Sequence, residues 1–225
     1  MQAFQDRLGY SFDNPDLLTE AMRHRSWINE SAPDLPSNER LEFLGDAFLG
    51  WAIAAIAFHR YTDMPEGVLT DLRKAVVNAD ALAEIARELN LGGNILLGRG
   101  EASSGGKDKV SILSDTMEAV IGAVLLDGGC TDAFAVVERL FADRLAQARS
   151  HPERLDFKSA LQEELSHRGR SAPDYVTHCE GPDHDKRFYT KVFVSRQLAG
   201  QGEGRSKKAA EKAAAQAAYA SLVAD

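Results

Sequence analysis

Three carboxylates attract attention through their spacing in the stretch SNERLEFLGDAFLG, residues 37–50. Glu39, Glu42 and Asp46 are spaced i, i+3 and i+7, so on a helix they share one face within an arc of about 60°. The rest of this helix, including Trp51 on the opposite side, is mostly apolar, which predicts that it is buried. A buried carboxylate without a partner is neutralised, and no Lys or Arg lies along the same stripe. The three acids therefore need a partner from outside this stripe.

A second acidic pair lies in LSDTMEAVIGAVLLDGG, residues 113–129. Asp115 and Glu118 are spaced i and i+3 on an otherwise apolar helix, and glycines lie near the acids of both helices (Gly50, Gly122), where close approach is useful. Packed acid to acid, they would place at least four carboxylates around one space. Mg²⁺ is commonly held by carboxylates, waters and substrate phosphates, and two such ions can assist a phosphoryl displacement.

Purely structural roles and other metals account less well for these acids. Acidic pairs at helical spacing are common on solvated faces or in salt bridges at core ends, but their repetition on two apolar helices favours a functional cluster. Carboxylate-bridged iron needs Glu-x-x-His on two helices, and the only match is Glu164 with His167. Two cysteines, Cys130 and Cys179, are too few for a cysteine-based zinc site or a disulfide framework.

Composition indicates a soluble, cytoplasmic protein. A length of 225 residues suits one large or two small domains, and a hydrophobic fraction of 44% allows the chain to bury a core. The N-terminus lacks the pattern of a secretory signal, and the longest apolar stretch, 49–58, is about half a membrane span. The net charge of −8 is uneven, because residues 156–225 carry 11 Lys/Arg against 10 Asp/Glu. An acidic chain is a poor binder of phosphate backbones, so any nucleic-acid site depends on local arrangement.

The chain divides into two domains of different class. Helical periodicity without convincing strands predicts an all-α domain over 1–148, with helices in 37–61, 67–90, 109–127 and 132–148. Residues 149–155 are polar with a proline and indicate a linker. Residues 156–225 predict a small α+β domain in the order α-β-β-β-α. Its expected elements are a helix over 157–167, strands at 175–180, 188–194 and 197–202, and a helix over about 206–222.

The last helix begins in GEGRSKKAAEKAAAQAA with lysines where a helix favours anions. Ser206 is a plausible N-cap, and Lys207 and Lys208 enter the first turn, where they could meet an external anion, although a solvated helix start is the plainer alternative. The expected sheet-facing alanines are Ala210, Ala213, Ala214 and Ala217. The first helix of this domain presents a polar face made of Ser159, Gln162, Glu163 and Ser166. His184 lies in the loop GPDHDKR between the first two strands.

The combination resembles the ribonuclease III family over nearly the whole chain. NERLEFLGDA is similar to its signature helix and SDTMEA to its second acidic motif, and MRHRSW, PEG and LLGRGEASSGG resemble further segments in the right order. Residues 156–222 resemble its double-stranded-RNA-binding domain. One departure is Arg23, in the position before the histidine where the family often has Thr.

The resemblance implies an endonuclease that hydrolyses double-stranded RNA as a homodimer, with Mg²⁺ as cofactor and Mn²⁺ able to substitute. Products would carry 5′-phosphate and 3′-hydroxyl ends, in processing of ribosomal RNA precursors and other structured transcripts. By motif position, the implied metal ligands are Glu42, Asp46, Asp115 and Glu118, with Asp46 and Glu118 also catalytic. Glu39 and Glu66 would be supporting acids. Implied RNA-binding residues are Ser159, Gln162, Glu163, His184, Lys207 and Lys208.

Phe43 matches the position where the family docks an aromatic ring into the partner subunit. Spacing alone leaves open that Phe43 is an intramolecular core residue, since Phe is often buried. Two rival functions also stay open at this point. One is a binding protein with an inactive nuclease fold, against which the intact acids argue. The other is a helical phosphohydrolase acting on a small molecule, which leaves the RNA-binding domain unexplained.

Overall fold

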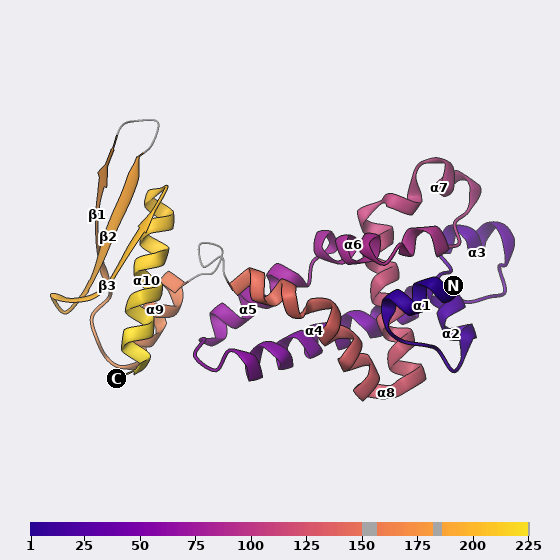
Figure 1. Ribbon diagram of the computed structural model, residues 1–225, viewed down its shortest axis with the longest axis horizontal. Helices are drawn as coiled ribbons and strands as arrows, with labels where there is room; N and C mark the ends of the chain where they lie inside the picture. Colours follow the sequence, from indigo (N-terminus) through magenta and orange to yellow (C-terminus); the bar gives the residue numbers. More distant parts are fainter. Residues whose placement is uncertain (150–156, 182–185, 225) are drawn as a thin grey trace. The chain divides into compact units, whose positions relative to one another are not determined.

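The protein is described by a computed structural model over residues 1–149, 157–181 and 186–224 (Figure 1). Its contacts divide the chain into two compact units. One consists of Met1–Ile56 with Arg73–Leu145, and the other of Ala57–Leu72 with Ala146–Asp225. The predicted linker lies outside the described residues except for Arg149. The domain boundaries at 148, 149–155 and 156 remain predictions.

All regular elements before residue 150 are helices, as predicted. They are α1 (Gln2–Leu8), α2 (Pro15–Ala21), α3 (Arg25–Ser31), α4 (Glu39–Arg60), α5 (Glu66–Val76), α6 (Ala79–Glu88), η1 (Leu91–Asn94), α7 (Arg99–Ser103), η2 (Gly106–Asp108) and α8 (Val110–Arg149). The single helix expected over 67–90 is two, because Asn78 adopts an extended conformation and caps α6 by accepting a hydrogen bond from the Ala81 N–H. The break expected at DGGC, residues 127–130, is a kink at Gly129, where φ is 76°.

Helices α4 and α8 cross with their backbones in close contact. A Cβ added at Gly45 would overlap the carbonyl of Glu118, and one added at Gly122 would overlap the carbonyl of Leu41. Gly122 therefore fulfils the expectation of close approach. Gly50 does not, because nothing lies within 4 Å of the position of its Cβ. Gly45, which helical spacing did not single out, is the true counterpart of Gly122.

The apolar surface of α4 is only partly buried. Leu41 and Leu49 are in the core, whereas Phe43 is 79% exposed. Trp51, expected on the buried side, is 56% exposed and contacts Phe134, with the ring centroids 5.9 Å apart. By length and composition α4 and α8 could each cross a membrane, but α8 also contributes many fully buried side chains to the helical core. Part of α4 thus presents apolar surface that this chain leaves uncovered.

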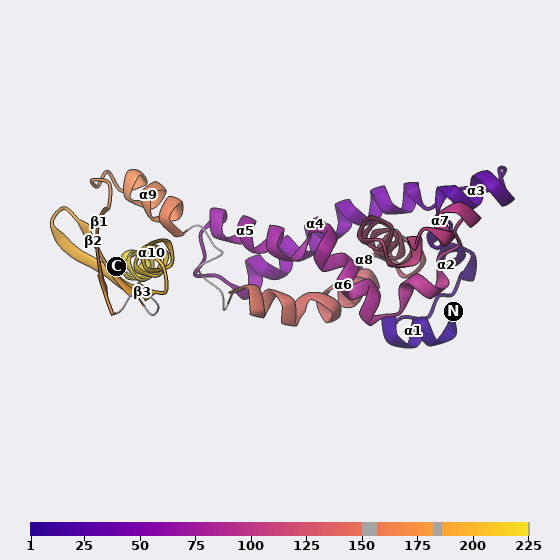
Figure 2. The same cartoon turned by 90° about the horizontal axis from the view of Figure 1, so that it is seen from above.

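The C-terminal part has the predicted order α-β-β-β-α. Its elements are α9 (Phe157–His167), β1 (Asp174–Glu180), β2 (Arg187–Val194), β3 (Gln197–Gly204) and α10 (Lys207–Ala224). The strands form an antiparallel sheet in the order β1-β2-β3, with Thr177 opposite Thr190 and a register shift between Val192 and Phe193. Both helices lie on the same side of this sheet (Figures 1 and 2).

Glycines also bring α10 close to β3. A Cβ at Gly200 would overlap the backbone N–H of Ala218, and one at Gly202 would overlap that of Ala214. The buried alanines of α10 are Ala210, Ala214, Ala215 and Ala218. The expected face was wrong at Ala217, which is exposed, and Ala213 is half-buried. The reason is that the i, i+4, i+8 row beginning at Ala210 faces the sheet.

Gly45→Ala should destabilise the helical unit, because the new methyl group meets backbone atoms that cannot rotate away. We expect the free energy of unfolding in urea to fall by roughly 1–3 kcal/mol, the usual cost of overpacking. Gly50→Ala is the matched control in the same helix, and it should leave stability unchanged or raise it by up to about 1 kcal/mol through better helix propensity. Equal stability of the two variants would contradict the close crossing.

Candidate active site

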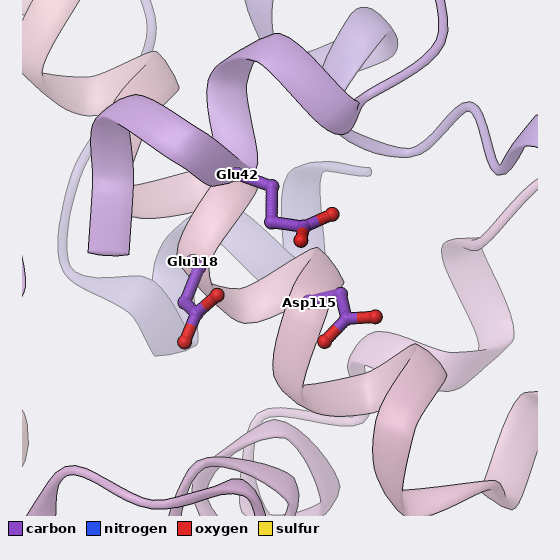
Figure 3. A group of neighbouring side chains, drawn as sticks. All are labelled: Glu42, Asp115 and Glu118. Carbon is purple, nitrogen blue, oxygen red and sulfur yellow. The ribbon is translucent and has the colours of Figure 1, made fainter. Parts of the chain in front are cut away.

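Three carboxylates from the two crossing helices converge on one space. Glu42 of α4 and Asp115 and Glu118 of α8 each offer an oxygen, and these oxygens all lie within 4.8 Å of one another. Figure 3 shows these three neighbouring side chains, with Glu42 on one helix and Asp115 and Glu118 on the other. All three are half-buried. The backbone contact at Gly45 and Gly122 sets this separation, since it fixes how closely the two acidic faces can approach.

Two more predicted acids lie at the edge of this cluster. Asp46 is one turn beyond Glu42 and is exposed, and its negative charge raises the pKa values of both Glu42 and Glu118. Glu39 is exposed at the start of α4, where it accepts a hydrogen bond of 2.8 Å from the Ser37 hydroxyl. Its charge also raises the pKa of Glu42. The acidic stripe of α4 is therefore one continuous electrostatic feature with the acids of α8.

The cluster is electrostatically unsatisfied. Burial, followed by the charges of Asp46, Asp115 and Glu42, raises the pKa of Glu118 to about 8. Burial, followed by the charge of Asp115, also raises the pKa of Glu42. Since the donor set consists of carboxylate oxygens, it fits a hard cation such as Mg²⁺ and does not resemble the nitrogen and sulfur ligands of zinc.

A cleft of about 620 Å³ adjoins the cluster. Its lining residues are His24, Arg25, Ser26, Asn29, Asn38, Glu39, Glu42, Glu101, Lys109, Ser111, Ile112 and Asp115. No role was predicted for His24, Arg25 or Asn29, although they lie in or just after the motif MRHRSW. The histidine caps α3 by accepting a hydrogen bond from the Ser26 N–H, and burial lowers its pKa. The resemblance of MRHRSW to a family segment could have drawn attention to these residues, but helical periodicity does not link residues 24–29 to the acids.

Glu66 is the first residue of α5. Its exposed carboxylate accepts a hydrogen bond of 2.8 Å from the Thr70 hydroxyl. It belongs to the other compact unit from Glu42, Asp115 and Glu118. Its supporting role therefore stays a prediction.

The predicted RNA-binding side chains of the C-terminal domain are solvent-exposed. They are Ser159, Gln162 and Glu163 on α9, and Lys207 and Lys208 at the start of α10. Ser206 caps α10 as expected, with its hydroxyl accepting a hydrogen bond of 3.1 Å from the Ala209 N–H. His184 lies outside the described residues.

Phe43 is not an intramolecular core residue. Its side chain is 79% exposed on α4, although α4 is one of the most apolar helices of the chain. The exposed positions Phe43, Ala47, Trp51 and Ala54 follow one another at helical spacing. They form a single stripe, which we call the α4 apolar stripe, and exposed surface of this kind is typical of a protein interface.

Two family profiles cover most of the chain. Residues 14–145 match a family described as Ribonuclease-III-like, and residues 157–222 match the double-stranded RNA binding motif. These ranges correspond to the helical part, which carries the acids, and to the α-β-β-β-α part.

Individual proteins are similar over nearly the full length. The chain is 47% identical to Ribonuclease 3 of Thermobifida fusca over 222 residues, covering 99% of this chain and 92% of that protein. It is 49% identical to Ribonuclease 3 of Mycobacterium tuberculosis over 225 residues, covering 98% and 92%. The solved nuclease domain of ribonuclease III from Campylobacter jejuni is 42% identical with a TM-score of 0.59, covering 63% of this chain and 96% of that one. The chain therefore belongs to the ribonuclease III family of double-stranded-RNA-specific endoribonucleases.

Proposed function

We propose that Glu42, Asp46, Asp115 and Glu118 hold divalent cations, Mg²⁺ in the cell with Mn²⁺ able to substitute, for hydrolysis of double-stranded RNA. The convergence of three carboxylate oxygens within 4.8 Å carries this proposal. A pKa of about 8 for Glu118 supports it, because a nearby cation would allow this carboxylate to ionise at neutral pH. Glu39 and Glu66 are proposed as supporting acids.

The residues of the chain have separate roles in this reaction. A bound divalent cation supplies a Lewis acid for the phosphate and favours ionisation of the attacking water. Glu42, Asp115 and Glu118 would hold the cation. Asp46, exposed at the edge of the cluster, adds negative charge where solvent and substrate meet. Attack by water, and not by a 2′-hydroxyl, would leave 5′-phosphate and 3′-hydroxyl ends.

The C-terminal domain would supply affinity for the duplex. Modules of this class span about 16 base pairs and read the shape of two minor grooves and the phosphates between them. We assign the minor-groove contacts to Ser159, Gln162 and Glu163 of α9 and to His184, and the phosphate contacts to Lys207 and Lys208. Ribosomal RNA precursors and other structured transcripts in the cytoplasm are the proposed substrates.

A homodimer would cover the α4 apolar stripe. Each chain contributes one acidic cluster, but cutting both strands of a duplex takes two, and antiparallel strands are themselves related by local two-fold symmetry. The C. jejuni structure is described as having a region involved in dimer formation, which supports the same assembly here. Phe43, as the most exposed large apolar side chain of the stripe, is the proposed anchor.

Replacing Glu118 tests the proposed chemistry. Glu118→Gln should abolish cleavage of a long RNA duplex in Mg²⁺ while leaving duplex binding close to wild type, because Glu118 lies outside the RNA-binding domain. Cleavage is followed on a gel with product ends mapped, and binding by mobility shift. Retained cleavage would sink the assignment of Glu118. A wild-type protein that binds duplex without cutting it would instead indicate the binding protein with an inactive nuclease fold.

A double variant of Lys207 and Lys208, measured in the same assays, should weaken RNA binding without changing the cleavage step. Lys207→Ala combined with Lys208→Ala should weaken binding of all duplex sequences alike and flatten the salt slope of log K by about 1–2. Cleavage at saturating RNA should survive. An unchanged salt slope would show that these lysines are only solvated.

The metal-free protein should lose stability as pH rises. The folded pKa of Glu118, about 8, lies above its ordinary value of 4.5, so between these values the folded state binds more protons than the unfolded state. The free energy of unfolding therefore falls as pH rises from about 4.5 to 8. Denaturant unfolding with a chelator at pH 5 and pH 8 measures this difference. Glu118→Gln should reduce it, and Mg²⁺ should stabilise the wild type most at pH 8; a wild type equally stable at both pH values would refute the expectation.

Phe43→Asp should give a folded monomer. The side chain is largely exposed in the single chain, so the helical circular dichroism spectrum should be unchanged, whereas a charge would disrupt the proposed interface. Sedimentation at micromolar concentration distinguishes monomer from dimer. Leu198→Asp, at an exposed leucine of the C-terminal domain, is the control and should stay dimeric. A Phe43→Asp protein that still forms dimers would rule out the anchor.

A further inference from the structure

One wall of the cleft beside the acids is formed by helix α3. Arg25 and Asn29 both line this cleft, together with Glu39, Glu42 and Asp115 on the acidic side. The two residues are spaced i and i+4 on α3, so their side chains lie on the same face of that helix. A cation and an amide are therefore presented together opposite a group of carboxylates.

Both side chains lack a polar partner within the described part of the chain. Among the residues that the structure describes, neither Arg25 nor Asn29 makes a side-chain hydrogen bond or an ion pair, and both are exposed. Lys109, the other cation of the cleft, is different because its ammonium group lies 2.5 Å from a carboxylate oxygen of Glu101 and 3.0 Å from the Ser104 hydroxyl. The charge of Lys109 is thus already paired, whereas the guanidinium of Arg25 stays available.

Arg25 is close enough to the acids to influence them. Its charge lowers the pKa of Glu42, opposing the larger effects of burial and neighbouring acids, which raise it. Arg25 nevertheless makes no ion pair with any of these carboxylates. An arginine placed in this way can engage an external anion, and its planar group of donors matches a phosphate in particular.

We propose that Arg25, with Asn29, binds the backbone of the RNA strand beside the phosphate that is cut. This inference rests on the proposed cleavage of double-stranded RNA and adds residues that position the substrate. Successive phosphates of one strand are separated by only a few ångströms of helix rise. With one phosphate at the acids, we place a neighbouring phosphate of the same strand against the α3 wall of the cleft. Arg25 binds this phosphate, and the Asn29 amide donates to the same backbone.

Arg25→Ala tests this assignment in steady-state cleavage of a long duplex in Mg²⁺. We expect KM to rise about tenfold, the usual effect of losing one charge-assisted hydrogen bond, with a smaller change in kcat. The salt slope of log(kcat/KM) should flatten by about 1. Asn29→Ala should raise KM without changing the salt slope. Arg25→Lys keeps the charge and should retain the wild-type salt slope. Arg99→Ala, at an exposed arginine outside the cleft, should have the KM and the salt slope of the wild type.

The outcomes separate this inference from the function on which it rests. If Arg25→Ala has the KM and salt slope of the wild type, Arg25 does not contact RNA. If the Arg25→Ala variant instead needs more Mg²⁺ for cleavage at an unchanged KM for RNA, Arg25 acts on the acids and the inference is also wrong. A wild-type protein that fails to cut duplex RNA would overturn the proposed function itself. Melting temperatures of all variants establish that each is folded.

Discussion

Mutual repulsion among carboxylates held at fixed separation is the constraint on which the rest of this structure depends. The close crossing of α4 and α8 at Gly45 and Gly122 buries the acidic faces and brings them together, and burial, followed by the charges of the neighbouring acids, raises the pKa of Glu118. A backbone contact of this kind cannot relax by rotating a side chain. The helical core therefore stabilises an arrangement that its own charges oppose, and a cation is the natural means of relieving that opposition.

The same packing device positions the N-terminal end of α10, where the proposed RNA-binding lysines lie. Gly200 and Gly202 let the helix backbone approach β3, and a Cβ at Gly204 would meet Ala209 and the backbone of Ala210. This last contact lies within one turn of Lys207, so it fixes where the first turn of α10 and its lysines begin. In both parts of the chain, glycine at a helix contact determines where charged side chains are presented.

Helical periodicity in the sequence was enough to place the five acids of α4 and α8 on two faces and to predict that the faces meet. It could not distinguish Gly45 from Gly50, because which glycine is crowded depends on where the other helix crosses. For the same reason Trp51 and Ala217 were assigned to buried faces that they do not occupy. Arg25 and Asn29 do not emerge from the sequence because they line the cleft beside the acids from a short helix, in a tertiary arrangement that periodicity does not encode.

The distribution of charge explains how an acidic chain can act on a polyanion. Residues 156–225 contain 11 basic and 10 acidic side chains, so the negative net charge of −8 comes wholly from the first 155 residues. Without cations, the acidic cluster repels the phosphates that it is proposed to cut, and duplex affinity would come from the C-terminal domain. Cations at the acids reverse this repulsion locally. Arg25, on the opposite wall of the cleft, offers the strand a positive charge that does not depend on bound metal, so a phosphate beside the one that reacts can be held there.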